Sequence, residues 1–167
     1  MLGRTYFHLH EVDPFLAEAE QAIALNPNNS ILLASVGLDM SFVGKWDRGA
    51  ELTQRAMRLS PNPPGWMHTF DFWQHYRKRE YEKTVVAAET YRTKSPDFFW
   101  PHLMLAAGYR QLGRKKDAEA AAARLLELYP GFRGKARAEM RIWNISTELT
   151  EHTMDGLRKA GLEIPPP

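Results

Sequence analysis

Apolar residues recur along the chain at the three- to four-residue spacing of an α-helix, and the helical stretches come in pairs. Residues 30–61 show this pattern clearly. Four apolar side chains share one face of the first stretch: Ile31, Ala34, Leu38 and Phe42. Gly44 then offers the positive φ with which many helices end, and Trp46 opens a second stretch that stops at Pro61. The pattern predicts a helix, a tight turn and a second helix.

The same pair recurs along the chain with a nearly constant period. Four prolines, spaced 34, 35 and 34 residues apart, close the similar phrases ALNP, RLSP, TKSP and ELYP: Pro27, Pro61, Pro96 and Pro130. Proline lacks a backbone donor and disfavours helical geometry in the residue before it, so each one marks a loop between hairpins. A helical repeat of this length predicts an all-α fold, a right-handed solenoid of antiparallel helix hairpins that bury their apolar faces by stacking.

We expect a single helical repeat domain over residues 1–167, with about ten helices. Its parts are a partial repeat, three repeats and a C-terminal segment of capping helices and tail: residues 1–29, 30–61, 62–96, 97–130 and 131–167. Asp13 and Pro14 suit the start of the second helix of the partial repeat. The capping helices are expected over residues 133–147 and 149–160. The chain is thus expected to begin within a solenoid, and a larger parent protein is one interpretation.

The middle repeat departs from its neighbours in three places. Phe72 occupies a position that is small in the other repeats, Arg79 stands where the turn glycine is expected, and Pro63-Pro64 brings a one-residue insertion. A left-handed backbone costs a non-glycine residue roughly 1 kcal/mol. The turn near Arg79 is therefore expected to differ from the turns of the neighbouring repeats.

The repeats resemble the tetratricopeptide repeat over roughly residues 30 to 130. The resemblance rests on small residues at Gly37 and Ala106 in the first helices, alanines such as Ala122 in the second helices, and the terminal prolines. It implies a binding or scaffold module, because the first helices of tetratricopeptide hairpins line a concave groove.

A second resemblance is carried by the C-terminal phrase of residues 155–162. Three shorter phrases accompany it: Gly44-Lys45-Trp46-Asp47, Pro64-Gly65-Trp66 and Trp100-Pro101-His102. Together they look like the repeat region that follows the catalytic or DNA-binding domain in some bacterial class III adenylyl cyclases and related regulators. The resemblance implies a regulatory, protein-binding segment. It implies no cyclase activity here, because that activity needs a separate domain with metal-binding aspartates.

Composition and charge narrow the class of protein further. The chain has 167 residues, no cysteine and a net charge of +2, with acidic residues interspersed among the basic ones. A nucleic-acid surface usually concentrates basic residues, so nucleic-acid binding is not expected. No apolar run is long enough to span a membrane and no signal peptide is indicated. We expect a cytoplasmic protein without membrane attachment.

Candidate chemical sites are few. His68 and His75 lie seven residues apart on one predicted helix with Asp71 between them, and zinc-binding histidines are usually three or four apart. The acid pairs Glu18/Glu20 and Glu80/Glu82 alternate within helices and so point in different directions. No phosphate-binding loop or nucleophile motif is present. The sequence therefore predicts neither an enzyme nor a cofactor or metal site.

Aromatic density marks a candidate binding groove. The tetratricopeptide arrangement places eight residues on the concave face: Trp66, Thr69, Trp73, Tyr76, Arg77, Trp100, Leu103 and Arg110. Tryptophan, tyrosine and arginine often dominate recognition surfaces, but ordinary packing between helices is the favoured explanation for such aromatics. The lysine, asparagine and arginine of the chaperone-binding carboxylate clamp are missing, because the matching positions hold Ala34, Leu38, Phe70, Trp100 and Met104. A bound peptide would use apolar or aromatic anchors and an acidic group near an arginine.

These observations favour a non-catalytic protein interaction or assembly module whose partner is a protein or peptide. One alternative is RNA binding, since pentatricopeptide arrays are also helical hairpins of similar period. The terminal prolines and mixed charges count against it. Another alternative is self-association into homo-oligomers, with the incomplete repeats at the N-terminus stacking between copies.

Overall fold

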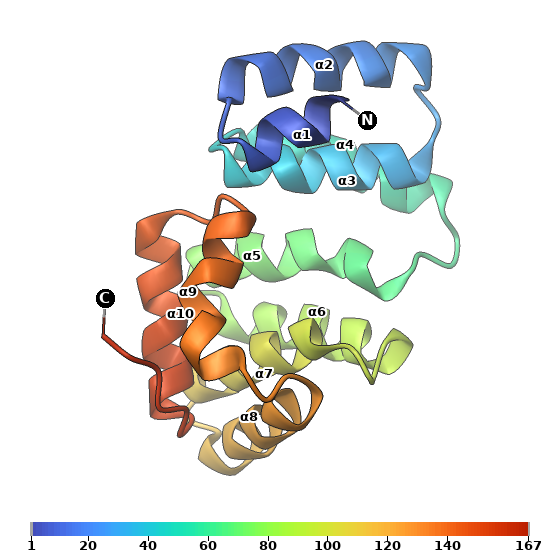
Figure 1. The fold of residues 1–167 in the computed structure, drawn as a ribbon. Helices are drawn as coiled ribbons and strands as arrows, with labels where there is room; N and C mark the ends of the chain where they lie inside the picture. The colour runs from blue at the N-terminus through green and yellow to red at the C-terminus, as the bar shows by residue number, and fades with distance from the viewer. Residues whose placement is uncertain (1, 167) are drawn as a thin grey trace. The chain divides into compact units, whose positions relative to one another are not determined.

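The computed structural model describes residues 2–166, and over these residues the backbone forms ten α-helices, one short 3₁₀ helix and no strand (Figure 1). The elements are α1 (Leu2–His8), α2 (Val12–Leu25), α3 (Ser30–Phe42), α4 (Trp46–Leu59), η1 (Gly65–His68), α5 (Thr69–Arg77), α6 (Tyr81–Lys94), α7 (Phe99–Gln111), α8 (Lys115–Leu128), α9 (Phe132–Ile142) and α10 (Thr147–Lys159). The predicted all-α class and number of helices are confirmed. None of these helices is long and apolar enough to cross a membrane in the part of the chain that the structure describes.

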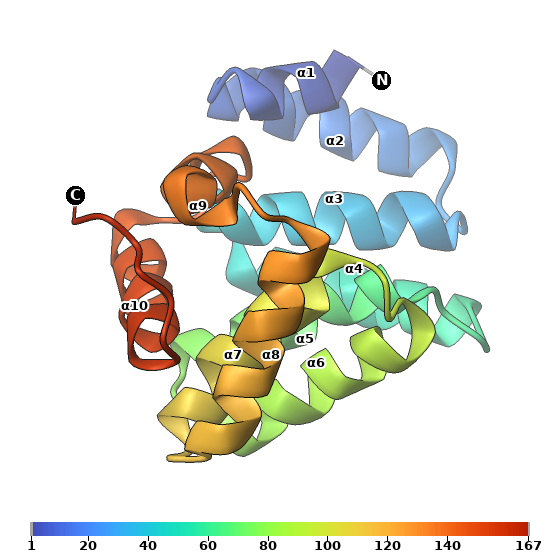
Figure 2. The ribbon, with the colours of Figure 1, turned by 60° about the horizontal axis from the view of Figure 1, so that its bottom comes forward.

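Consecutive helices pair into four hairpins: α1 with α2, α3 with α4, α5 with α6, and α7 with α8 (Figure 2). Small residues set the closeness of the pairs. A Cβ atom added at Gly37 would lie 2.7 Å from Oγ1 of Thr53 and 2.9 Å from the backbone oxygen of Gly49. Because backbone atoms cannot move aside, only glycine lets α3 and α4 approach this closely.

The first hairpin also has a glycine where its two helices approach each other, and the sequence prediction overlooked it. A Cβ atom at Gly3 would lie 3.2 Å from Cβ of Glu18, so Gly3 holds the place in α1 that Gly37 holds in α3. The signal was present in the sequence, because Leu2-Gly3 followed by Tyr6 fits the Leu-Gly-x-x-Tyr phrase of the tetratricopeptide pattern. The partial repeat is thus built like the later ones.

The three central turns share one backbone geometry. Gly44, Arg79 and Gly113 have φ of 87°, 61° and 72°. In each turn the next amide donates to the carbonyl oxygen five residues earlier, at 2.9 Å, 3.0 Å and 2.9 Å. The expectation that the turn at Arg79 differs was wrong, because this hydrogen-bonded closure imposes the left-handed conformation whichever residue occupies the position.

Contacts within the chain define two compact units. The first comprises Met1–Pro63 with Arg141–Ile145, and the second comprises Pro64–Met140 with Ser146–Pro167. Each unit has its own buried aromatic and aliphatic side chains. Phe7, Phe15 and Leu33 are buried in the first unit, and Phe72 and Phe132 in the second. The single-domain prediction stays a prediction.

The first unit includes a segment from far along the chain. Nδ2 of Asn144 donates to the backbone oxygen of Phe7 at 2.7 Å, and Nδ1 of His8 lies 3.0 Å from the backbone oxygen of Ile142. The guanidinium of Arg4 lies over the ring of Trp143, 5.3 Å from its centroid. The short connection between α9 and α10 is thereby attached to α1.

The C-terminal helices differ from the predicted pair in length and in packing. They cover Phe132–Ile142 and Thr147–Lys159, where residues 133–147 and 149–160 were expected, because the chain leaves helical geometry at Trp143 and Asn144 takes a φ of 54°. In the second unit α10 packs against α7, the first helix of the third full repeat. Leu162 and Ile164 in the tail after α10 are buried as well.

Candidate partner-binding surface

The predicted groove residues all lie on η1, α5 and α7, the first helices of the hairpins in the second unit, and their exposure divides them into two groups. We call this side of the unit the inner face. Trp73, Tyr76 and Leu103 are fully buried. The others keep exposed surface: Trp66, Thr69, Arg77, Trp100 and Arg110. The inner face is thus closed over one part and open over another.

The buried part centres on an aromatic cluster within α5. The rings of Phe72 and Tyr76 stack at 5.3 Å with an angle of 13°, and Trp73 meets Phe72 edge to face at 4.9 Å. Such pairs add about 0.5–1.5 kcal/mol beyond the burial of their area. Trp73 and Tyr76 therefore act as core residues in this conformation, which the packing alternative in the sequence analysis allowed for.

Helix α10 covers Tyr76 and Ala107. A Cβ atom added at Gly156 would lie 3.1 Å from the hydroxyl oxygen of Tyr76 and 3.3 Å from Cα of Ala107. Oη of Tyr76 donates to the backbone oxygen of His152 at 3.2 Å, and the two rings lie 4.7 Å apart. Oη of Tyr81 and Nε2 of His152 are 3.1 Å apart. One part of the predicted groove is therefore already occupied by a helix of the same chain.

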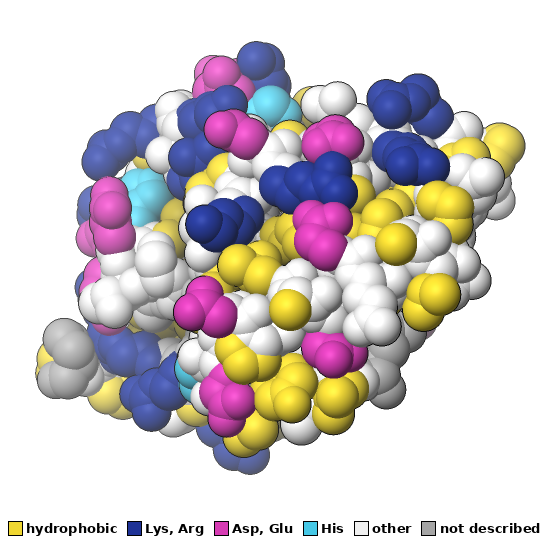
Figure 3. All heavy atoms as spheres, turned by 90° about the horizontal axis from the view of Figure 1, so that it is seen from above, with side chains coloured by type: hydrophobic (Ala, Val, Ile, Leu, Met, Phe, Trp, Pro, Cys, Tyr) yellow, Lys and Arg dark blue, Asp and Glu magenta, His cyan; other side chains and the backbone are white. Residues whose placement is uncertain are grey.

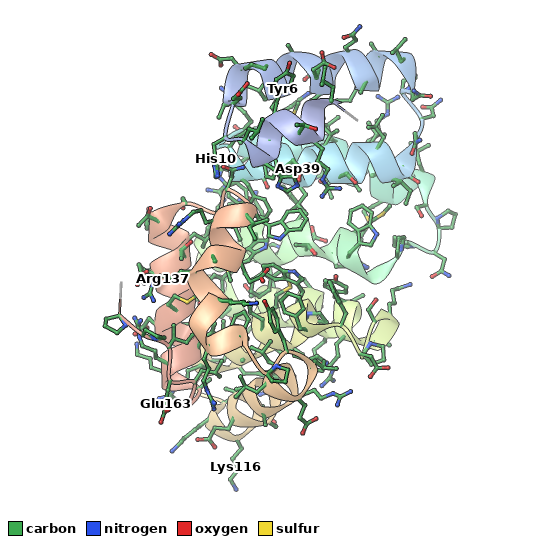
Figure 4. The ribbon with its side chains drawn as sticks, viewed as in Figure 1. Tyr6, His10, Asp39, Lys116, Arg137 and Glu163 are labelled. Atoms are coloured by element: carbon green, nitrogen blue, oxygen red, sulfur yellow. The ribbon has the colours of Figure 1, made fainter. Side chains whose placement is uncertain are left out.

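Arg137 in α9, labelled in Figure 4, forms hydrogen bonds with α10 and with the tail after it. Its guanidinium donates from Nε to Oε1 of Glu151 at 2.8 Å and from Nη2 to Oε2 at 3.1 Å, and Nη1 donates to the backbone oxygen of Pro165. Two parallel bonds between arginine and carboxylate fix direction as well as distance. The Arg137 guanidinium holds the pKa of Glu151 below its usual range.

Two titratable groups at the covered part respond to burial. Burial raises the pKa of Tyr76 well above its usual range, so the hydroxyl stays protonated and remains a donor. Burial, and then the nearby positive charge of Arg79, lower the pKa of His152 from its ordinary 6.5. The imidazole is therefore held in its neutral form beside Tyr81.

Three of the five exposed groove residues lie at the beginning of the first helices, and the other two, Arg77 and Arg110, lie near their ends. Trp66 and Trp100 occupy the same position in successive repeats, 34 residues apart, and both are partly exposed. Glycine is needed before Trp66, because a Cβ atom at Gly65 would lie 2.7 Å from the ring of Tyr91 and 2.9 Å from its backbone oxygen. Thr69 stands one turn after Trp66. We call Trp66, Thr69 and Trp100 the tryptophan surface.

The histidines considered as metal ligands have other contacts. Nδ1 of His75 lies 2.5 Å from Oε2 of Glu80, and Lys83 lies 3.4 Å from the same oxygen. Nδ1 of His68 is 3.9 Å from Asp71. Among residues 2–166, no three histidine, aspartate or glutamate side chains converge as a metal site would require.

No model of a protein family and no curated protein sequence matches the chain. The fold is similar to that of MamA. The solved structure described as "Crystal structure of MamA" has a TM-score of 0.65 and 16% identity, over 96% of this chain and 92% of that one.

Two further MamA structures give the same result. The one described as "MamA AMB-1 P212121" has a TM-score of 0.64 and 18% identity over 95% of this chain and 88% of that one. The one described as "MamA MSR-1 C2" has a TM-score of 0.61 and 18% identity over 95% and 90%. MamA is a helical repeat protein of tetratricopeptide type, so the predicted solenoid fold is confirmed.

The sequence prediction missed the residues that cover the inner face. Gly156, His152 and Arg137 lie beyond the fourth proline, where the repeat pattern fades. One signal was available. Helix α10 begins at Thr147, 32 residues after α8 begins at Lys115, which is close to the repeat period. The period predicts a helix there but does not say on which surface it packs.

Proposed function

We propose that this protein is a non-catalytic module that binds a segment of a protein partner on the inner face of its second unit. The observation that carries the proposal is the tryptophan surface, with two partly exposed tryptophans at equivalent positions in the first helices of successive repeats. Tryptophans in such positions supply large contact areas at small entropic cost. Arg77 and Arg110 lie further along the same helices and supply cations for an acidic group of the partner.

Some of the proposed contacts anchor the partner segment, and others orient it. The tryptophan surface takes apolar or aromatic side chains, and an arginine takes the carboxylate. Trp73, Tyr76 and Leu103 lie behind the surface and keep the helices in register while they remain buried.

A peptide display library tests the proposal. Peptides selected on the full chain are expected to combine an aromatic or apolar residue with an acidic one. Trp66→Ala and Trp100→Ala are each expected to weaken their binding about tenfold or more, as for hot-spot residues. Val86→Ala, at an exposed apolar residue of α6, is the matched control and should leave binding unchanged. Unchanged binding in both tryptophan variants, with unchanged melting temperatures, would remove the surface from consideration.

Self-association is a second candidate, favoured by exposed apolar residues of the first hairpin. Four large apolar side chains of α1, α2 and the turn between them are exposed: Leu2, Leu9, Val12 and Leu25. Residues 5–44 contain no lysine or arginine. Figure 3 views the molecule from the α2 side of Figure 1 and shows hydrophobic side chains interspersed with acidic and basic ones on that face. Sedimentation over a range of concentrations, with Leu9→Lys as the variant, tests whether copies associate there.

RNA binding and a place in a larger signalling protein can each be tested separately. RNA binding would show as filter binding that falls steeply with salt, because phosphate contacts release counterions. The phrase at residues 155–162 supports a place for this chain as the regulatory segment of a larger bacterial signalling protein. The reading frame upstream of Met1 tests that placement, since a cyclase or winged-helix domain is expected there.

A further inference from the structure

Helix α10 packs against the inner face, although the repeat pattern predicts that it pairs with α9. Each second helix from α2 to α8 pairs with the first helix that precedes it, whereas α10 packs against α7 of another hairpin. Its side-chain link to α9 is the pair formed by Arg137 and Glu151. The inner face therefore accepts a helix that is not part of the local hairpin.

The contacts of α10 depend on few features of its sequence. Tyr76 donates to a backbone oxygen, which any helix with a free carbonyl group could present. Position 156 needs a small residue, because a Cβ atom added there would lie 3.3 Å from Cα of Ala107. Four apolar side chains of α10 and of its C-cap are buried: Leu149, Met154, Leu157 and Ala160. A helix from another protein with a small residue at the crossing point meets the same conditions.

Charge decides which helices fit. Arg137 binds the carboxylate of Glu151 with two hydrogen bonds, and the positive charge of Arg79 acts on His152. Two cations, Arg137 and Arg79, therefore act on α10. Helix α10 carries the acidic residues Glu148, Glu151 and Asp155 along its first three turns and the basic residues Arg158 and Lys159 at its end. A competing helix should carry acidic residues at the corresponding positions.

We infer that the inner face of the second unit is a docking surface for acidic amphipathic helices, that α10 is its built-in occupant, and that a partner helix binds by displacing α10. The inference rests on the proposed function, because it names the partner class and the regulation of the same inner face. A tethered helix competes at an effective concentration of the order of millimolar, so an external helix binds weakly until α10 is loosened.

The test uses the full chain and a fluorescent synthetic peptide of residues 146–164. Glu151→Lys in the chain breaks the pair with Arg137 and loosens α10, while the peptide keeps its glutamate. Anisotropy is expected to show about fivefold or tighter peptide binding to this variant than to the natural chain. Glu163→Lys changes the same charge on an exposed residue of the tail and is the matched control, with binding unchanged. Equal affinity of the peptide for all three chains would overturn the inference.

An engineered disulfide that holds α10 against α7 is the complement of Glu151→Lys, which loosens α10. The chain has no cysteine, and a Cβ atom at position 156 would lie 3.4 Å from Cβ of Ala107, close to the separation found in disulfides. Ala107→Cys with Gly156→Cys should abolish peptide binding when oxidised. When reduced, the double variant should bind the peptide more tightly than the natural chain, because a side chain at position 156 pushes α10 away from Ala107. Hydrogen exchange in the natural chain should show faster exchange of the α10 amides when peptide is added. Tight peptide binding to the oxidised form would place the peptide elsewhere and refute the inference.

The tryptophan variants separate this inference from the proposed function. Trp66→Ala and Trp100→Ala should weaken the display-selected peptides and leave binding of the residue 146–164 peptide to Glu151→Lys chains within twofold. If the display-selected peptides are unaffected while the α10 peptide still responds to Glu151→Lys, the tryptophan surface fails and the docking surface stands. If only the tryptophan variants have an effect, α10 is a permanent part of the core.

Discussion

Gly156 crosses Ala107 so closely that a Cβ atom on Gly156 would lie 3.3 Å from Cα of Ala107. The same Cβ atom would lie 3.1 Å from the hydroxyl oxygen of Tyr76. Helices approach this closely only where one of them lacks a side chain. The single glycine in α10 thus determines how α10 lies on α7, and with it which part of the inner face remains open.

Gly156→Leu is expected to destabilise the protein by about 1 to 3 kcal/mol, because the added side chain must push α10 away from Tyr76 and Ala107. Urea unfolding followed by circular dichroism measures the change. Gly134→Ala in α9 is the control, since a Cβ atom there meets no other atom within 4 Å among residues 2–166. That control is expected to raise the free energy of unfolding by about half a kcal/mol. Equal stability of Gly156→Leu and the natural chain would contradict the close crossing.

Arg79→Gly is expected to stabilise the protein by about 1 kcal/mol, because glycine adopts a positive φ without the steric cost that arginine meets. The φ of Arg79 is 61°, against 87° and 72° for Gly44 and Gly113 in the equivalent turns. Gly113→Ala makes the opposite change, from glycine to a residue with a side chain, and should destabilise the protein by a similar amount. Thermal unfolding of both variants checks the pair, and a fall in stability for Arg79→Gly would show that the arginine makes a compensating contact.

Asp39 should make the first unit less stable as pH rises. Its side chain is buried in α3, Nε of Arg4 lies 3.7 Å from Oδ2, and Oδ1 has no hydrogen-bond partner among the described residues (Figure 4). Burial raises the pKa of Asp39 to about 7 despite the opposing charge of Arg4. The native state therefore binds the proton more tightly than the unfolded chain, whose carboxyl has a pKa near 3.8.

Its stabilising contribution is fully present below about pH 4 and is lost as pH rises to about 7, with an upper limit of roughly 4 kcal/mol. Asp39→Asn should remove this slope and be more stable than the natural chain at pH 8. Denaturant unfolding between pH 4.5 and 8 gives the comparison. Asp47→Asn, at an exposed residue of α4, should leave the profile unchanged. A parallel pair of profiles for Asp39→Asn and the natural chain would show that Asp39 is ionised in both states.

His152 should make the protein less stable as pH falls, whereas Asp39 makes it less stable as pH rises. Its pKa is lowered by burial and then by Arg79 and Lys159, whereas Asp155 and Glu148 raise it, and its ring faces Tyr76 and Tyr81. A histidine with a lowered folded-state pKa is destabilising when protonated, so stability falls as pH drops below about 6.5. His152→Gln should flatten the decline between pH 7 and 5, which hydrogen exchange of the α10 amides can follow. An unchanged decline would mean that α10 does not depend on this imidazole.

Local features of the sequence were sufficient for the hairpins. Each proline acts on the residue beside it, and each turn closes through hydrogen bonds within six residues, so the period of the prolines predicted where helices begin and end. Gly44 and Gly113 indicated the positions of their turns in the sequence. Arg79 did not, because the neighbouring hydrogen bonds override its preference, and Gly3 was overlooked although its phrase fits the repeat.

The identity of the exposed groove residues was beyond local reasoning. Periodicity places Trp66, Trp73 and Tyr76 on one face of a helix, but exposure depends on what packs over that face. Here Tyr76 lies under α10, while Trp66 keeps partly exposed surface. Asp39 shows the same limit, since its raised pKa follows from burial that no spacing reveals.

The sequence by itself determined the all-α class, the hairpin repeats and the turn positions, because these follow from proline, glycine and helical spacing over a few residues. Only the tertiary structure decided that α10 lies on α7, that Tyr76 and Ala107 are covered, and that part of the inner face stays open. Those outcomes depend on contacts among residues 76, 107 and 156, which lie far apart along the chain and meet only after the repeats have stacked.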